Sequence, residues 1–126
     1  MVATRKIAFP RRGEIWLVSF DPTLGAEIKK TRPALILQND IANQASPITI
    51  VAAVTSRFDS KLYPTEVMVR KQVSVLLVDS VVLLNQIRSV DITRLIRRLG
   101  RLDSETMMRV DRALAVSVGL IPLGRN

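Results

Sequence analysis

The chain has 126 residues and carries 19 Lys and Arg against 11 Asp and Glu, which gives a formal net charge of +8. It contains no histidine and no cysteine, which excludes disulfides, thiol nucleophiles, Ser-His-Asp catalysis and zinc sites built on those ligands. No apolar run approaches the roughly 20 residues of a membrane span. We therefore expect one cytoplasmic domain without a membrane contact. Its charge favours nucleic acid or an acidic protein segment as partner, unless it serves solubility alone.

The first predicted strand covers "GEIWLVSF" at residues 13–20 and follows a basic tail at residues 1–10. Apolar side chains occupy both odd and even positions, so we expect both faces of this strand to be covered. The next segment, "DPTLGAEIKKT", contains Asp-Pro and a glycine and lacks a period, which predicts a loop. It is followed by "RPALILQ" at residues 32–38, a short apolar run typical of a buried strand.

The middle of the chain alternates between turn-like and strand-like segments. The composition of "NDIANQASP" predicts a turn, whereas "ITIVAAVT" (48–55), "EVMV" (66–69) and "DSVVLLNQIRSV" (79–90) read as strands. "SRFDSKLYPT" reads as a second exposed loop, and "RKQVSVLL" fits a helical turn. "DITRLIRRLGRL" at residues 91–102 fits a turn of helix before a last strand, but its periodicity does not decide.

The end of the chain carries the signals of an amphipathic helix. Asp103 suits an N-cap, Gly119 suits a left-handed C-terminal cap, and Pro122 follows it. Apolar residues between the caps recur at helical spacing: Met107, Val110, Leu114 and Val118. Five or six short strands without long intervening helices predict an antiparallel curled sheet or small barrel, closed by this C-terminal helix.

The chemistry open to such a chain is narrow. It has no phosphate-binding GxxxxGK[ST] or GxGxxG motif and no Asp-x-Asp cluster for a two-metal site. RNA cleavage suits this set of residues, because the 2′-hydroxyl of RNA can itself attack the neighbouring phosphorus. The protein must then supply geometry and charge stabilisation, which arginine provides through its planar, permanently charged guanidinium.

Arg32 is the first candidate for that role. Pro33 disfavours helical angles at Arg32 and is itself tolerated at the start of a strand. Arg32 is therefore expected on a stiff backbone at a strand mouth, facing out of the core, where it either clamps a phosphate or is a solvated charge. Thr55, at the end of the 48–55 strand, either donates its hydroxyl to a phosphate oxygen or is simply a good strand former.

The order of motifs is similar to that of the MazF/PemK/Kid family of toxin endoribonucleases. The resemblance rests on "RRGEIWLVSFDPTLGAEIKKTRPALILQND", "ITIVAAVTS", "YPTEV" and "LLNQIRSVD", and runs from about residue 11 to residue 120. It implies one toxin domain at residues 11–121, followed by a C-terminal tail at residues 122–126. The implied fold is mainly β, an SH3-like β-barrel of the MazF/CcdB type with short helices, one of them C-terminal.

The resemblance also implies an activity and its partners. The unit is expected to be a homodimer that cuts single-stranded RNA at short motifs without a metal or other cofactor. The products would carry a 2′,3′-cyclic phosphate and a 5′-hydroxyl. A cognate MazE-like antitoxin would mask the RNA groove with an acidic segment.

Site residues follow from the matched motif positions. The resemblance makes Arg32 the principal catalytic group and Thr55 its partner at the scissile phosphate. Glu27 is either catalytic or an ion-pair partner that orients Arg32. Where other members carry small or glycine-rich residues between this glutamate and the arginine, this chain has Ile-Lys-Lys-Thr, which puts the cleavage motif in question. The expected RNA-binding residues are Lys29, Lys30, Ser56, Arg57, Gln86 and Arg88.

Two other functions fit parts of the sequence. One is a CcdB-like toxin that binds DNA gyrase through its C-terminal helix, although such proteins lack the Arg-Pro strand entry. The other is a non-catalytic RNA-binding module, in which Arg32 and Thr55 only bind phosphate.

Overall fold

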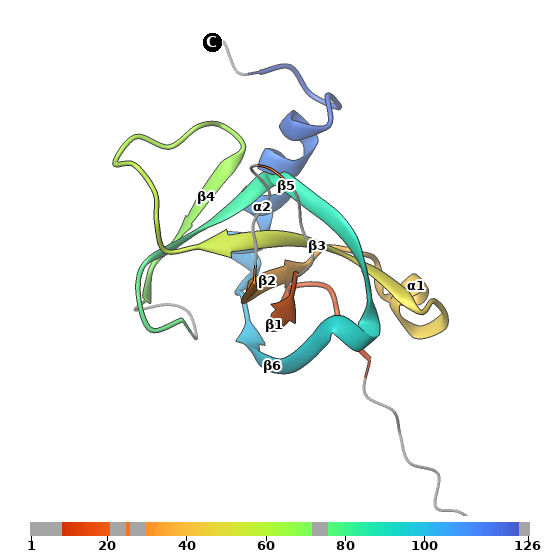
Figure 1. Ribbon diagram of the computed structural model, residues 1–126. Coiled ribbons are helices and arrows are strands. Elements are labelled where there is room, and N and C mark those ends of the chain that lie inside the picture. Colours follow the sequence, from red (N-terminus) through yellow and green to blue (C-terminus); the bar gives the residue numbers. More distant parts are fainter. Residues whose placement is uncertain (1–8, 21–24, 26–29, 72–75, 124–126) are drawn as a thin grey trace, which may run out of the picture.

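The structure is a computed structural model that describes residues 9–20, 25, 30–71 and 76–123. Within these residues it contains six strands, two α-helices and a 3₁₀ turn (Figure 1). The strands are β1 (Glu14–Ser19), β2 (Thr31–Ile36), β3 (Ile48–Thr55), β4 (Glu66–Val69), β5 (Ser80–Asp91) and β6 (Leu95–Arg101). The helical elements are α1 (Asp40–Ala45), the 3₁₀ turn η2 (Ile92–Arg94) and α2 (Ser104–Ser117).

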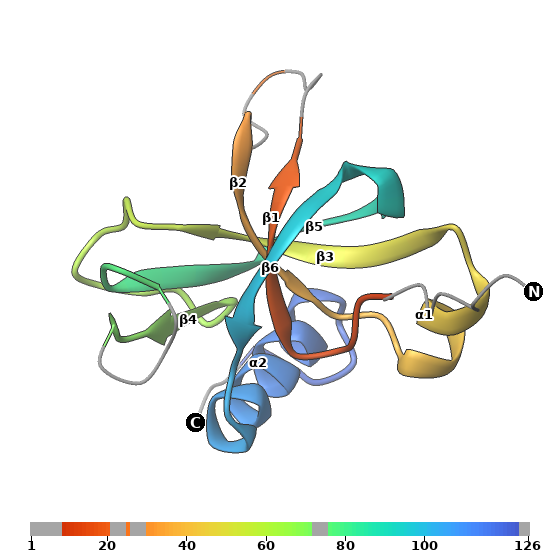
Figure 2. The ribbon, with the colours of Figure 1, turned by 90° about the horizontal axis from the view of Figure 1, so that it is seen from below.

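The six strands form one antiparallel sheet in the order β4-β5-β3-β2-β1-β6. The sheet is strongly curled: β5 arches over β3 and the chain continues through η2 into β6, on the far side of β1 (Figures 1 and 2). The predicted fold class, a small curled β structure with a C-terminal helix, is confirmed. None of the helices in the described ranges is both long and apolar enough to cross a membrane.

Apolar side chains form a core on each face of the sheet. On one face, β-strand residues such as Ile15 and Val54 pack with Val110 and Ala113 of α2. The opposite face forms the interior of the curl, with these fully buried or nearly buried side chains: Val18, Phe20, Ala34, Ile36, Val51 and Val90. β1 therefore needs apolar residues at both odd and even positions, as its sequence indicated. Burial of each large side chain contributes about 1.5–3 kcal/mol.

The segment "NDIANQASP" was predicted as a turn, and this prediction was wrong because it forms the short helix α1. Asn39 acts as its N-cap, with its side chain accepting a hydrogen bond from the Ala42 N–H at 2.8 Å. Asn43 is only 2% exposed, accepts from the Thr49 hydroxyl at 2.8 Å and donates to the Gln38 carbonyl. Asn and Asp favour both turns and helix caps. Here the hydrogen bond from Thr49 of β3 stabilises the helical conformation.

β5 contains a bulge that bends the sheet. Ala52 of β3 pairs with Ile87, but the next residue, Ala53, pairs with Leu83. The three residues 84–86 are therefore extra on the β5 side. The two halves of β5 follow different directions: one half pairs with β4 and the end of β3, and the other with the beginning of β3.

The segment at residues 91–102 resolves into η2 followed by β6. The carboxylate of Asp91 accepts hydrogen bonds from the backbone N–H of Thr93 at 2.8 Å and from its hydroxyl at 2.7 Å. These two bonds, with a smaller contribution from the charge of Arg94, lower the pKa of Asp91. A local cap of this kind ends β5 and turns the chain into β6, which confirms the helical turn and last strand.

Both predicted caps of the C-terminal helix are present in α2. Asp103 is the N-cap, and its carboxylate accepts from the Thr106 N–H at 2.8 Å. At the other end Gly119 has φ +80°, which favours glycine. The Leu120 N–H donates to the Ala115 carbonyl at 2.7 Å, and the Gly119 N–H donates to the Val116 carbonyl at 3.1 Å. This pair of bonds is a Schellman motif.

A buried carboxylate ties the N-terminal segment to β6. The side chain of Glu14 is 8% exposed. It accepts from the Arg11 N–H at 2.9 Å, from the Trp16 Nε1–H at 2.9 Å and from the Arg98 Nε–H at 2.7 Å. Three donors satisfy the carboxylate, which offsets the cost of its burial.

Replacing Glu14 tests this network. We expect Glu14→Ala to lower the free energy of unfolding by about 2–4 kcal/mol, because the indole and backbone donors lose a buried acceptor. Glu14→Gln keeps one acceptor oxygen and should cost less. Urea titration of both variants measures the difference. A loss under about 0.5 kcal/mol in the alanine variant, within the range of ordinary surface substitutions, would contradict the proposed weight of the network.

Acid unfolding tests the Asp103 cap. Hydrogen bonds from the side chain and backbone of Thr106 lower the pKa of Asp103. Because its folded pKa lies below the unfolded value, the stabilisation is present above the unfolded pKa of about 3.9 and is lost as pH falls through the folded pKa. Asp103→Asn keeps a good N-cap but does not titrate. The stability advantage of the wild type over Asp103→Asn should shrink as pH falls below about 4, and a pH-independent difference in urea titrations would contradict this assignment.

Candidate active site

Arg32 lies near the start of β2, where it is partly buried and paired with Val18 of β1. The β2–β3 ladder pairs Ala34 with Ala53. Two residues further along each strand come Arg32 and Thr55, so this register brings the strand ends that carry them alongside each other. The arginine is therefore placed by two ladders at once, and it is not enclosed in the core.

The hydroxyl of Thr55 shapes the turn that follows β3. Its Oγ1 accepts from the Arg57 N–H at 3.0 Å and donates to the Arg57 carbonyl at 3.4 Å. The first bond fixes the oxygen, whereas the second is at the long limit of a hydrogen bond. The hydroxyl proton is therefore weakly held and can turn toward a nearby phosphate oxygen. The side chain is 9% exposed.

Arginines from β2, β5 and η2 converge on the end of β1. Arg32 pairs with β1 as described, and Arg88 lies over the Phe20 ring with its Cζ 5.4 Å from the ring centroid. Arg88 also donates to the Phe20 carbonyl at 3.4 Å, and Arg94 donates to the Ser19 carbonyl at 3.2 Å. Backbone carbonyls hold Arg88 and Arg94 in place, so guanidinium groups gather near the end of β1.

A cavity of about 480 Å³ opens beside Arg32. Arg97 of β6 and Ser56 contribute its other polar groups near Arg32, and the segment 76–78 closes one side. Strand residues contribute much of its apolar lining, in addition to that segment: Leu17, Pro33, Val54 and Leu99. Such a lining accepts the flat apolar face of a base while the rim binds phosphate.

The ion pairs of the described residues do not involve Arg97 of this cavity. Among the described residues the ion pairs are Arg12 with Asp111, Arg70 with Asp79, and Arg98 with Glu14. Arg57, Arg88 and Arg97 take part in none of the ion pairs found in those ranges. These three guanidinium groups therefore remain available for a polyanion.

The remaining predicted site residues are distributed as follows. Glu27 and Lys29 lie outside the described residues. Lys30 is exposed and has φ 68°, a strained left-handed conformation for a residue with a side chain. Its carbonyl accepts from the Phe20 N–H at 2.9 Å, so it closes the segment between β1 and β2. Gln86 lies in the β5 bulge and is half-buried.

Sequence reasoning missed Arg94 and Arg97. Both lie in the segment at residues 91–102, whose periodicity did not decide between helix and strand. Once it is a strand, neighbouring basic residues must point to opposite faces. Arg98 then reaches Glu14, whereas Arg97 reaches the cavity.

The described residues contain no group of three or more carboxylates that could hold a metal ion, and the sequence supplies no His or Cys. What these residues bring together is several guanidinium groups, two hydroxyls and an apolar cavity. This set can bind a phosphodiester and stabilise added negative charge on it.

Comparison with known proteins shows the family of this chain. Residues 11–118 match the family model described as PemK-like, MazF-like toxin of type II toxin-antitoxin system. A crystal structure of MazF from Deinococcus radiodurans is similar at 30% identity, with a TM-score of 0.76, covering 90% of this chain and 99% of that chain. A MazE-MazF structure from the same organism is similar at 28% identity, with a TM-score of 0.69 and coverage of 90% and 98%.

A mycobacterial endoribonuclease in complex with its cognate antitoxin has the same fold. Its identity to this chain is 22%, with a TM-score of 0.75 and coverage of 90% of this chain and 98% of that chain. The family match spans both strand ends of the site and all of α2. The chain belongs to the PemK-like, MazF-like toxins of type II toxin–antitoxin systems.

Proposed function

We propose that the protein is an endoribonuclease toxin that cuts single-stranded RNA at short sequence motifs without a metal ion. The observation that carries this proposal is the position of Arg32, on a strand end alongside Thr55 and at the rim of a cavity. The mycobacterial structural neighbour is an endoribonuclease, which supports the same class of activity.

In the proposed reaction the RNA 2′-oxygen attacks the adjacent phosphorus and the bond to the 5′-oxygen breaks. The 2′-hydroxyl loses its proton and the departing 5′-oxygen gains one, which leaves a 2′,3′-cyclic phosphate and a 5′-hydroxyl. Arg32 stabilises the negative charge of the phosphorane, and Thr55 donates to one of its oxygens. Glu27 either takes the 2′-proton or orients Arg32 as an ion-pair partner.

The RNA chain on either side of the scissile phosphate is bound by surrounding cationic and amide side chains. We assign this role to Lys29, Lys30, Ser56, Arg57, Gln86 and Arg88. Arg57 and Arg88 suit it because neither is neutralised by a carboxylate in the described ranges. Phosphate contacts of this kind give affinity that falls with salt.

The proposed unit is a cytoplasmic homodimer with RNA in a groove across its two protomers. Leu77 is 91% exposed and Val78 52% exposed beside the Arg32 cavity, which supports cover by another protein surface. The proposed regulator is a MazE-like antitoxin, as in the MazE-MazF complexes of the structural neighbours. An acidic antitoxin segment would compete with RNA for the same arginines.

Substitution of Arg32 tests the catalytic assignment. We expect Arg32→Ala to slow RNA cleavage by about 10²- to 10³-fold, because one charge-stabilising donor is lost at the phosphorane. Arg32→Lys should recover part of the rate, since the charge remains but the bidentate fork is lost. Single-turnover cleavage of labelled RNA measures both.

The matched control is Arg101→Ala, which removes the same charge from the opposite end of the β1–β6 ladder, where Arg101 pairs with Glu14. It should leave the single-turnover rate nearly unchanged. If Arg32→Ala cleaves as fast as this control, Arg32 is not catalytic. If RNA binds tightly to the wild type yet stays intact, the protein is a non-catalytic binding module.

Metal removal tests the reaction type. Because the proposed nucleophile belongs to the RNA and the charge is stabilised by arginine, cleavage should proceed at an unchanged rate in excess EDTA. The upstream product should have a 3′ end that resists ligation of a label until the cyclic phosphate is removed. A strict requirement for Mg²⁺, restored on its addition, would refute the mechanism.

A further inference from the structure

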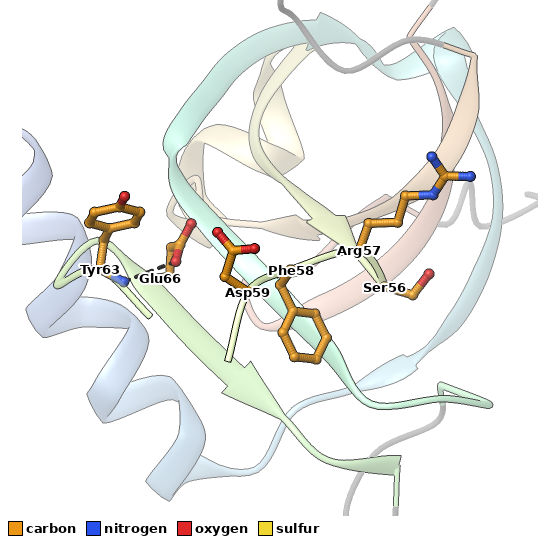
Figure 3. A pocket seen from close by; sticks show the side chains of 6 residues that line it. All are labelled: Ser56, Arg57, Phe58, Asp59, Tyr63 and Glu66. Atoms are coloured by element: carbon orange, nitrogen blue, oxygen red, sulfur yellow. Dashed lines mark hydrogen bonds between the residues drawn. The ribbon is translucent and has the colours of Figure 1, made fainter. Parts of the chain in front are cut away.

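A second cavity, of about 580 Å³, lies beyond the end of β3. Its lining comes from the segment 56–59, from Tyr63 and from Glu66 at the start of β4 (Figure 3). Ser56 borders both this cavity and the one beside Arg32, so the two are neighbours.

Two aromatic rings are left accessible here. Phe58 is 37% exposed and Tyr63 is 67% exposed. The chain has five aromatic residues in all, three Phe, one Trp and one Tyr, and two of them are placed at this surface and not in the core. Accessible aromatic rings beside a basic strand-binding surface are what unstacked RNA bases stack on.

The polar lining of this cavity includes two carboxylates, those of Asp59 and Glu66, beside the hydroxyl of Ser56 and the guanidinium of Arg57. Carboxylates do not bind phosphate. In Figure 3 the carboxylates of Asp59 and Glu66 lie between the rings of Tyr63 and Phe58, and Arg57 extends away from them. Glu66 accepts from the Tyr63 N–H at 3.0 Å and its own N–H donates to the Tyr63 carbonyl at 2.9 Å. These two hydrogen bonds close a turn that keeps Tyr63 next to the Glu66 carboxylate.

Asp59 is a different case from Glu66. Across residues 9–20, 25, 30–71 and 76–123 its carboxylate takes part in no hydrogen bond or ion pair. In a chain with a net charge of +8, a carboxylate at the edge of the RNA surface opposes phosphate binding. Such a group is useful there only toward hydrogen-bond donors, and the donors of RNA are on its bases and ribose hydroxyls.

We propose that this cavity binds a flipped-out guanine base of the RNA close to the scissile phosphate, an inference that rests on the proposed ribonuclease function. The Watson–Crick edge of guanine presents two neighbouring donors, the N1–H and the N2 amino group, which match the two oxygens of one carboxylate. The corresponding edge of uracil places two carbonyl acceptors beside its one donor, and these repel a carboxylate. Phe58 or Tyr63 supplies the stacking surface, and Asp59 reads the edge.

The chain length between the two sites is compatible with neighbouring nucleotides. Asp59 follows Thr55 by four residues in the sequence. A fully extended segment of this length spans at most about 14 Å. A base in this cavity therefore belongs to a nucleotide at or next to the cleavage point, and its identity sets which phosphate reaches Arg32.

Sequencing the 5′ ends produced from a random RNA pool tests this directly. The wild type should cut with guanine enriched at one position beside the cleavage point. Asp59→Asn should reduce that enrichment by about tenfold, because a good bidentate contact is worth about 1–3 kcal/mol of discrimination. The amide still offers one acceptor and adds a donor, so the same position should shift toward adenine or uracil while other positions keep their preference. Phe58→Ala should weaken cleavage without that shift.

The matched control is Glu105→Gln, which removes one negative charge from an exposed residue in the first turn of α2. It should leave the base preference unchanged. If Asp59→Asn cuts with the same flanking preference as this control, the guanine site is refuted while the ribonuclease function stands. A wild-type preference for uracil at every flanking position also refutes it.

A binding experiment tests the guanine site separately from the ribonuclease function. Random heptamers with 2′-O-methyl groups cannot undergo 2′-attack, so sequencing the bound fraction reports recognition alone. Guanine enrichment on the wild type, lost on Asp59→Asn, supports the base site even if no RNA is cleaved, in which case only the ribonuclease function fails. Absence of both cleavage and guanine enrichment overturns both proposals.

Discussion

The site depends on the pairing of β1 with strands on both of its sides. Backbone hydrogen bonds to β2 fix Val18 opposite Arg32, and those to β6 fix Leu17 opposite Arg97. Two cations from distant parts of the sequence are therefore positioned by one strand. A ladder of this kind is rigid because a slip by one residue would move every side chain of the strand to the other face. The buried residues of both cores penalise such a slip.

Local signals predicted the elements whose stability is itself local. Asp103 and Gly119 predicted both ends of α2, because a helix cap depends only on residues close to it in the sequence. Asn39 carries the same kind of signal and was read as a turn, since its cap begins a helix of six residues that needs β3 for support. The bulge of β5 had no visible signal in the sequence, because its cause is the switch from one pairing partner to another.

Residue positions were predictable where the backbone is locally constrained. Arg32 was expected at the mouth of a strand because of the proline beside it, and it lies near the start of β2. Arg97 could not be placed, because the face of β6 that it occupies was undecided until the strand was known. The position of Thr55 followed from the end of its strand, but its hydrogen bonds to Arg57 required coordinates. Asp59 and Glu66 carried no signal of a site, because the sequence indicated only an exposed loop and the start of a strand at their positions.

The β5 bulge restricts how this chain can vary among its relatives. The bulge adds an odd number of residues, so the alternation of side chains between the two faces of the sheet is shifted by one residue between the two halves of β5. Ser117 of α2 donates to the Leu84 carbonyl at 2.6 Å, which anchors the bulge from the helix side. A single-residue deletion there would rotate Arg88 from the interior of the curl to its outside. We therefore expect a one-residue insertion or deletion in this strand to destabilise the fold unless a second one restores the phase.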